Sequence, residues 1–402
     1  MNAVYDHIIA ILIVGAIFVG TVVVMPTMSL INLQAVDQQQ LRNTALNVFN
    51  AMLLGTGEPA DWGSIDPFYT DKPPVERFGL ASAQDSIFYV LDPDKVQRLV
   101  KGNPLGEINY TTAKKLLRLQ GYGFSFRIIP PFNVTKEDGT PITPTNNPAN
   151  LTGSNKDILQ YAVKVAYLDG RPIPNANILA TIVYTDGNRF NITGPCGNWT
   201  DALGVCRDNI KLEFAPTSWT AILRVSVADV AALIVTFGKT AKIIDINVVG
   251  DNIILTKPKD PSNAAVNVTS VYAVGEQNLP WLLYEGQGPP YDKFNTGEGS
   301  PFRLWPSSNH PTHPDGIFSG LSSYNPTILI FSLETSIKKD GEWKPGYQEL
   351  VVAGPYQNFL GHTVFEYGDS PKKSGSAVRI QRSVVISGMT YTAELLLWKE
   401  SP

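Results

Sequence analysis

An uncharged apolar run at the N-terminus constrains this chain more than any other feature of its sequence. No Asp, Glu, Lys or Arg occurs from Ile8 to Val36, and the stretch from Ile8 to Met25 is apolar almost throughout. A helix of about 20 such residues crosses the hydrocarbon core of a bilayer, so the run predicts a transmembrane helix. The first basic residue is Arg42, and we therefore expect that a basic leader has been removed ahead of the run.

The same helix is expected to continue outward as an amphipathic stem. Residues 33–54 are good helix formers, and the apolar ones among them recur at helical spacing up to Phe49, Met52 and Leu53. Gly55 and the segment up to Pro59 end the pattern. An apolar face of this length needs a partner, which is either a globular head or other copies of the chain.

Beyond about residue 60 the sequence has the pattern of a β-rich ectodomain. Short alternating segments are separated by turn signals such as Asp169-Gly170 and Asp186-Gly187, which predicts a small immunoglobulin-like sandwich. The last segment, Ala377 to Trp398, predicts a hairpin that turns at Ser387-Gly388. We therefore predict an α+β fold, in which a long N-terminal hydrophobic helix is followed by a β-rich ectodomain with immunoglobulin-like β-sandwich modules.

A chain of 402 residues is too long for one ordinary domain. The composition shifts place four parts: the N-terminal helix at 1–56, the first part of a head at 57–154, the sandwich module at 155–240, and a β-rich domain completing the head at 241–402. The net charge is −4 and no run of Lys or Arg exceeds two residues, so the sequence gives no electrostatic support for a nucleic-acid partner.

The two cysteines, Cys196 and Cys206, lie close together in the sequence. They lack the Cys-x-x-Cys spacing and the further ligands of a thiolate metal site. A local disulfide is the expected pairing, which implies an oxidising setting outside the cytoplasm. Two free thiols are the alternative.

Six Asn-x-Thr sequons mark candidate N-glycosylation sites. The four that fall in expected loops are the stronger candidates, and Asn109 is the weakest because it is also positioned to cap a helix. The candidates are Asn133, Asn150, Asn191, Asn198, Asn267 and Asn109.

No motif of a catalytic site occurs in the sequence. We find no nucleophile elbow, phosphate-binding glycine loop or zinc helix, and we expect neither an enzyme nor a cofactor other than N-linked glycans. His310 and His313 lie near Asp315 on a proline-rich segment, but their spacing fixes no coordination geometry and favours a solvated loop.

Several segments together resemble archaeal type IV pilin-like proteins, a family that includes the archaellins. The uncharged helix with its amphipathic stem is followed by Gly57-Glu-Pro-Ala-Asp-Trp62, then by Leu91-Asp-Pro-Asp-Lys-Val96. A short helix leading into a strand over Leu116–Ile128, and the closing strand pair Val378–Trp398, complete the similarity. Together these segments cover the two ends of the chain and leave its middle uncovered.

The resemblance implies a structural subunit of a pilus-like extracellular filament that polymerises with itself through the N-terminal helix. Such a subunit is inserted in the cytoplasmic membrane before assembly, and its glycosylated β domains lie outside and contact an adhesion target. The filament core is then expected to contain Ile8, Val14, Gly15, Phe18, Gly20, Val22 and Val24. The alternative is a membrane-anchored minor pilin or surface adhesin that does not polymerise, and a less favoured one is an ectoenzyme.

Overall fold

The computed structural model describes residues 2–65, 75–83, 85, 87–101, 103, 106–142, 147–237, 245–250, 252–256, 264–274, 280–285, 302–305, 328–339, 342–354, 364–371 and 376–400. In several elements, including residues 2–6 and 22–35 of the first helix, only the backbone is described.

The helices are α1 (Asn2–Leu54), α2 (Pro93–Gln97) and α3 (Tyr110–Leu116) in this part of the chain. The strands are β1 (Val90–Leu91), β2 (Tyr122–Ile129), β3 (Asn133–Lys136), β4 (Ala149–Thr152), β5 (Ile158–Ala166), β6 (Asn177–Thr185), β7 (Phe190–Trp199), β8 (Val205–Lys211), β9 (Ser218–Val227), β10 (Val230–Phe237), β11 (Asp245–Val249), β12 (Asn252–Thr256), β13 (Ala264–Val274), β14 (Pro280–Glu285), β15 (Phe302–Trp305), β16 (Ile328–Lys339), β17 (Glu342–Ala353), β18 (Phe365–Gly368), β19 (Ala377–Ile386) and β20 (Met389–Lys399).

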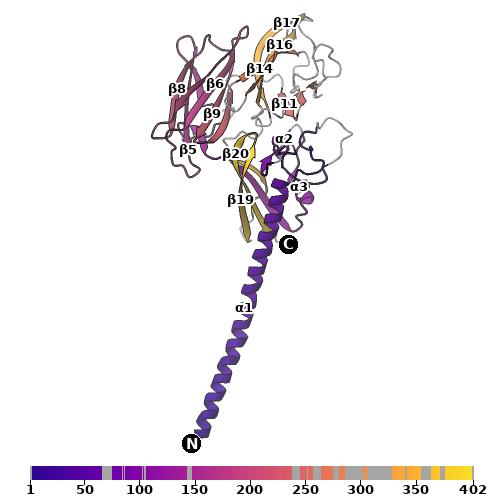
Figure 1. Ribbon diagram of the computed structural model, residues 1–402, viewed down its shortest axis with the longest axis vertical. Helices are drawn as coiled ribbons and strands as arrows, with labels where there is room; N and C mark the ends of the chain where they lie inside the picture. Colours follow the sequence, from indigo (N-terminus) through magenta and orange to yellow (C-terminus); the bar gives the residue numbers. More distant parts are fainter. Residues whose placement is uncertain are drawn as a thin grey trace.

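The first helix is a single rod that projects from the rest of the molecule (Figure 1). It holds 53 residues and passes through Pro26 without interruption. It ends at Leu54 as predicted, and the chain then turns at Gly57, whose φ of 80° suits a residue without a side chain. A Cβ at Gly57 would lie 2.6 Å from Trp62 Nε1. The turn therefore needs glycine for space as well as for backbone conformation.

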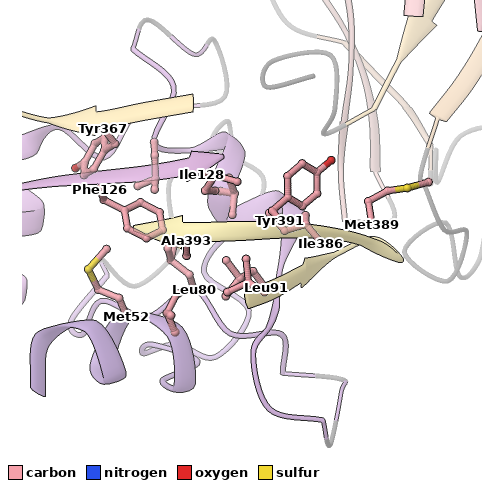
Figure 2. Packing of buried hydrophobic residues seen from close by; sticks show 14 of the residues in the cluster. Met52, Leu80, Leu91, Phe126, Ile128, Tyr367, Ile386, Met389, Tyr391 and Ala393 are labelled. Atoms are coloured by element: carbon pink, nitrogen blue, oxygen red, sulfur yellow. The ribbon is translucent and has the colours of Figure 1, made fainter. Parts of the chain in front are cut away.

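The upper end of α1 lies against a five-stranded sheet in the order β1-β19-β20-β2-β18. The β19–β20 hairpin forms as predicted, and its turn residues Ser387 and Gly388 both have positive φ, as a tight hairpin turn requires. Alternate residues of the sheet face the helix and are buried in one core with it (Figure 2). In that core Phe126 of β2 and Ala393 of β20 lie near Met52 of α1.

Residues 133–237 form a two-layer β-sandwich. One layer has β5 at its centre, with β3 and β4 sharing one edge and β8 on the other, and the second layer has the order β10-β9-β6-β7. Side chains from both layers, such as Val163 of β5 and Leu223 of β9, share one buried core. The predicted sandwich is therefore present, and it includes β3 and β4, which precede the expected boundary at residue 155.

In the layer β10-β9-β6-β7, which we call the inner layer, the strands β6 and β9 are largely buried, whereas the edge strand β7 is partly exposed. The second face of this layer contributes Val183, Ile222 and Leu233 to the core that also holds Ile330 of β16 and Leu350 of β17. β16 and β17 belong to a sheet in the order β14-β13-β16-β17, and β11, β12 and β15 form a further small sheet. Because β6, β9 and β10 contribute side chains to both cores, the sandwich is an integral part of the globular region above α1.

The predicted α+β class, with a long hydrophobic helix as its first part, is wrong. The described part of the chain is mostly β-sheet, with far more residues in strands than in helices. Its helices include none that combines the length and the apolar character needed to cross a membrane. The physical reason is that α1 joins two different segments. The apolar side chains described at its lower end, from Ile8 to Val19, are followed beyond Val36 by an amphipathic stem that carries Asp37 and Arg42.

Candidate functional site

The upper part of α1, from Leu41 to Leu54, packs through one face against the β-rich globular region, which we call the head. The side chains on that face recur every three or four residues, so they line one side of the helix. All of them are buried: Leu41, Ala45, Val48, Phe49, Met52 and Leu53. They enter the core formed with the five-stranded sheet, and this packing fixes the direction in which the rest of the helix leaves the head.

The lower part of α1 is apolar and uncovered on all sides. Leu12, Val14 and Phe18 expose 67%, 65% and 67% of their surface, and Ile11 and Ile13 are also exposed. Successive residues of a helix lie about 100° apart around its axis, so the four exposed positions 11–14 alone point in all directions. Nine of the eighteen exposed large hydrophobic side chains among the described residues lie in this part of α1, from Ile8 to Val19, and it is the candidate functional site.

The residues predicted for a filament core fall in this exposed part or just beyond it. Ile8 and Val14 are exposed, as is Phe18, and a Cβ placed on Gly15 or Gly20 would meet no other atom within 4 Å. The helix is therefore free of contacts at both glycines, and another helix can approach closely there. Val22 and Val24 lie in α1, but their side chains are outside those described.

A buried polar cluster fixes the junction between stem and head. Lys95 of α2 is fully buried, and its Nζ donates to the backbone oxygens of Thr56 at 3.0 Å and Ala81 at 2.7 Å. The same ammonium lies 3.5 Å from Asp92 Oδ2. A Cβ on Gly63 would lie 2.5 Å from Lys95 N, so the loop after α1 also packs directly on this lysine. Lys95 thereby connects the end of the stem to α2.

Asp94 extends the same cluster toward β11. Its carboxylate accepts hydrogen bonds from Gly250 N and Gln97 Nε2, each at 2.8 Å. Burial, reinforced by the neighbouring Asp92, raises the pKa of Asp94 to about 7. The ammonium of Lys95 has a lowered pKa for the same first cause, burial. The guanidinium of Arg98 completes the cluster by donating to the backbone oxygens of Gly63 and Gly106.

Sequence reasoning identified the segment of this cluster but not its role. Asp92 caps α2 and accepts from Asp94 N at 2.9 Å. The burial of Lys95 was not predicted. One sequence signal for its burial was available, since the apolar residues Leu91, Val96 and Leu99 flank Lys95. A single lysine in such a position is nevertheless more often at the surface.

The predicted disulfide is wrong. Cys196 of β7 is partly buried and Cys206 of β8 is buried, and both are free thiols. The two cysteines lie on strands of different layers, opposite Ala180 and Val163 respectively, and they pack into the sandwich core as small apolar side chains. Burial raises the pKa of both thiols, that of Cys206 to about 11.

The candidate glycosylation sites lie in strands more often than the sequence predicted. Asn133, Asn150, Asn191 and Asn198 were expected in loops, but they belong to β3, β4 and β7. Asn267 lies in β13, with its side chain outside those described, and the exposed Asn109 caps α3 by accepting from Thr112 N. Edge strands with short alternating patterns are difficult to separate from loops when polar residues dominate them.

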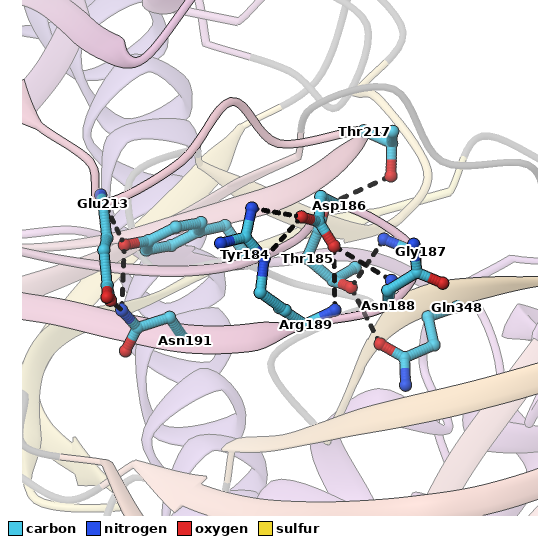
Figure 3. A network of polar contacts seen from close by, with 10 residues as sticks. All are labelled: Tyr184, Thr185, Asp186, Gly187, Asn188, Arg189, Asn191, Glu213, Thr217 and Gln348. Atoms are coloured by element: carbon cyan, nitrogen blue, oxygen red, sulfur yellow. Dashed lines mark hydrogen bonds and ion pairs between the residues drawn. The ribbon is translucent and has the colours of Figure 1, made fainter.

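Asn191 belongs to a polar network at one end of the sandwich (Figure 3). Its Nδ2 donates to Tyr184 Oη at 3.2 Å and to the carboxylate of Glu213. Nearby, Asp186 accepts from the backbone of Asn188 and Arg189. Thr185 Oγ1 donates to Gln348 Oε1 of β17 at 2.9 Å, which ties the sandwich to the neighbouring sheet.

The described residues contain no group of three or more His, Cys, Asp or Glu side chains that could hold a metal ion. His310, His313 and Asp315 lie outside the described residues.

Comparisons with known proteins identify no family. No family model matches the chain, and no curated protein matches it. Trypsin-activated alpha-2-macroglobulin from Escherichia coli aligns with 8% identity over 63% of this chain and 19% of that one, with a TM-score of 0.21. A Salmonella alpha-2-macroglobulin mutant aligns with 10% identity over 70% and 20%, with a TM-score of 0.14. The chain spans about a fifth of the length of these structures, and scores this low support no conclusion about fold or function.

Proposed function

We propose that this chain is a structural subunit of an extracellular filament of the archaeal type IV pilus kind. In this proposal the lower part of α1 polymerises with the same part of other copies, and the β-rich head lies on the outside. The head then carries any glycans and makes the filament's contacts with its surroundings, including adhesion.

The observation that carries the proposal is the exposure of apolar side chains all around the lower part of α1. A helix that pairs with one partner needs an apolar stripe on one side. The positions 11–14 expose apolar side chains in every direction, so one partner would leave most of them in water. Several surrounding helices cover them all, which is the arrangement at the centre of a helical bundle.

The attachment of stem to head supports the same reading. In a filament each head has a fixed orientation relative to its own stem, so the two must be rigidly joined. Six buried apolar residues of α1 and the Lys95 cluster supply that joint. The exposed lower stem is therefore held at a fixed orientation to the head before assembly, which lowers the entropy lost on polymerisation.

The test uses the lysine variant Val14→Lys and the control Gln38→Lys. Gln38 is exposed on the same helix but outside the apolar part, so the control introduces the same charge without burying it. Material is sheared from the producing cells, imaged by cryo-electron microscopy, and identified by mass spectrometry. We expect helical filaments from the wild type and from Gln38→Lys, and none from Val14→Lys, because a buried unpaired lysine is costly.

Normal filaments from Val14→Lys, with near-ultraviolet circular dichroism showing a folded head, would overturn the proposal. It would also be overturned if the wild-type chain occurs on cells only as single copies released by detergent. That result would favour the surface protein that does not polymerise.

A further inference from the structure

A second surface of α1 lies on the side of the stem away from the head. It consists of exposed residues separated by three or four positions, which we term the amide seam: Val36, Gln39, Asn43, Asn47, Asn50 and Leu54. With about 3.6 residues per turn, this spacing keeps all six on one side of a helix. Leu41, Ala45 and Phe49, which bind the head, occupy the opposite side. The amide seam is therefore uncovered along its whole length.

The composition of the amide seam is unusual for a helix face in water. It has no charged residue, although Asp37 and Arg42 are present on the same helix, and exposed helix faces are ordinarily rich in Lys and Glu. Asparagine is also a poor helix former, because its amide competes for backbone hydrogen bonds. The amides of Asn43, Asn47 and Asn50 form no hydrogen bond within the described part of the chain. Nothing in the part of one copy that the structure describes accounts for these three residues.

We propose that the amide seam packs against α1 of a second copy of this chain and sets the axial register between neighbouring stems. The inference rests on the proposed filament, because the proposed partner of the seam is the same neighbouring helix that covers the lower part of α1. The seam continues the same straight helix whose lower part is uncovered on all sides, so copies that surround the lower part run alongside the upper part as well.

The amide side chains of the seam are better suited to fixing the axial register between two stems than to strengthening their association. Apolar contacts such as those of Val14 or Phe18 are non-directional and tolerate sliding of one helix along another. Buried amides satisfy their hydrogen bonds at one alignment, and single Asn residues in the seams of coiled coils specify register at a cost in stability. The lower stem would thus supply the driving force, and the amide seam would select one axial offset.

The first experiment replaces amides by carboxylates of nearly the same shape. The double variant Asn43→Asp with Asn50→Asp places charge on the seam, and the matched control Gln38→Glu places it about 140° around the helix from Asn43. We expect the yield of sheared filaments from the double variant to fall at least about tenfold, since burying unpaired like charges opposes association strongly. The control should give the wild-type yield.

The second experiment tests register directly. In the double variant Asn43→Leu with Asn50→Leu, the seam keeps its contact area and loses its directional groups. We expect filaments to form, but with more than one axial rise per subunit in cryo-electron microscopy. Wild-type yield in the Asp variant, or a single wild-type rise in the Leu variant, would overturn the role of the seam.

The two proposals fail in different ways. If the wild type and Gln38→Glu form filaments, Val14→Lys does not, and the seam variants behave as wild type, only the seam proposal is wrong. If the wild type itself forms no filaments, both proposals are wrong.

Discussion

Lys399 Nζ of the last strand lies 3.2 Å from Asp37 Oδ1 of the stem. The pair stands just below Leu41, the first stem residue that the head buries. Both side chains are largely exposed, with 45% and 63% accessible surface, so the pair contributes at most about 1 kcal/mol. Its position identifies where the stem separates from the head, while the stability of the junction comes from the groups above it.

Phe49→Ala should loosen the stem from the head. Phe49 is 1% exposed in the core shared by α1 and the five-stranded sheet, and truncating a buried Phe costs about 3–5 kcal/mol. Tryptophan fluorescence during denaturant unfolding of the full chain measures the loss. The control Asn47→Ala lies on the exposed side and should change the free energy of unfolding by a few tenths of a kcal/mol, upward because Ala favours helices. Equal effects of the two variants would contradict the docked arrangement.

Lys95→Met should destabilise the head by about 3–5 kcal/mol, because it leaves the largely buried Asp92 carboxylate without its ion pair. It also removes the donors to Thr56 O and Ala81 O. Lys115→Met, at an exposed position, should stay within about 0.5 kcal/mol of the wild type. Adding Asp92→Asn to Lys95→Met should recover part of the loss in the same unfolding assay. A double variant that is no more stable than the single one would show that the ion pair is not the cause.

The stability of the head should fall as pH rises from about 4 to about 7. An aspartate side chain ordinarily has a pKa of 3.8, and burial first, then Asp92, raises the pKa of Asp94 to about 7 in the fold. Over that interval the unfolded chain releases a proton that the folded chain retains, so the folded state binds more protons and stability decreases with pH. Lys95 and Arg98 face the same cluster, and the raised pKa of Asp92 acts in the same direction. Denaturation midpoints at several pH values should show a smaller slope for Asp94→Asn, and an unchanged slope would refute the assignment to Asp94.

The sequence predicted the elements whose signals are local. The end of α1 at Leu54 and the β19–β20 hairpin each depend on residues adjacent in the chain, and both occur in the structure. The β-sandwich was predicted from alternation, but its predicted bounds began at residue 155 and left out β3 and β4, in which polar residues are frequent. Chain-local signals could not place these strands beside β5, since that pairing depends on contacts distant in sequence.

The errors about the candidate site arose from judging side chains without their surroundings. The apolar run predicted a transmembrane helix because of its composition. Composition does not show where, along one continuous helix, the apolar segment gives way to an amphipathic stem. The burial of Lys95 could not be predicted because it depends on two backbone oxygens that accept hydrogen bonds from its Nζ. Both oxygens belong to residues far from Lys95 in the sequence. The exposure of the lower stem on all sides could be inferred from its sequence, but the side of the stem that faces the head could be fixed only by the fold.

The cysteines give the last prediction, which separates a core role from a cross-link. Cys206 is buried beside Tyr161, and burial raises the pKa of its thiol to about 11. A thiol with a raised pKa is almost entirely protonated at neutral pH and reacts slowly. Iodoacetamide should therefore label Cys206 in the folded chain far more slowly than after unfolding, and both cysteines should be labelled after unfolding without any reductant. The midpoint of denaturation should be the same with and without reductant, because no bond is broken. An intact mass lower by two hydrogens, together with a midpoint that falls on reduction, would show that the two strands are cross-linked after all.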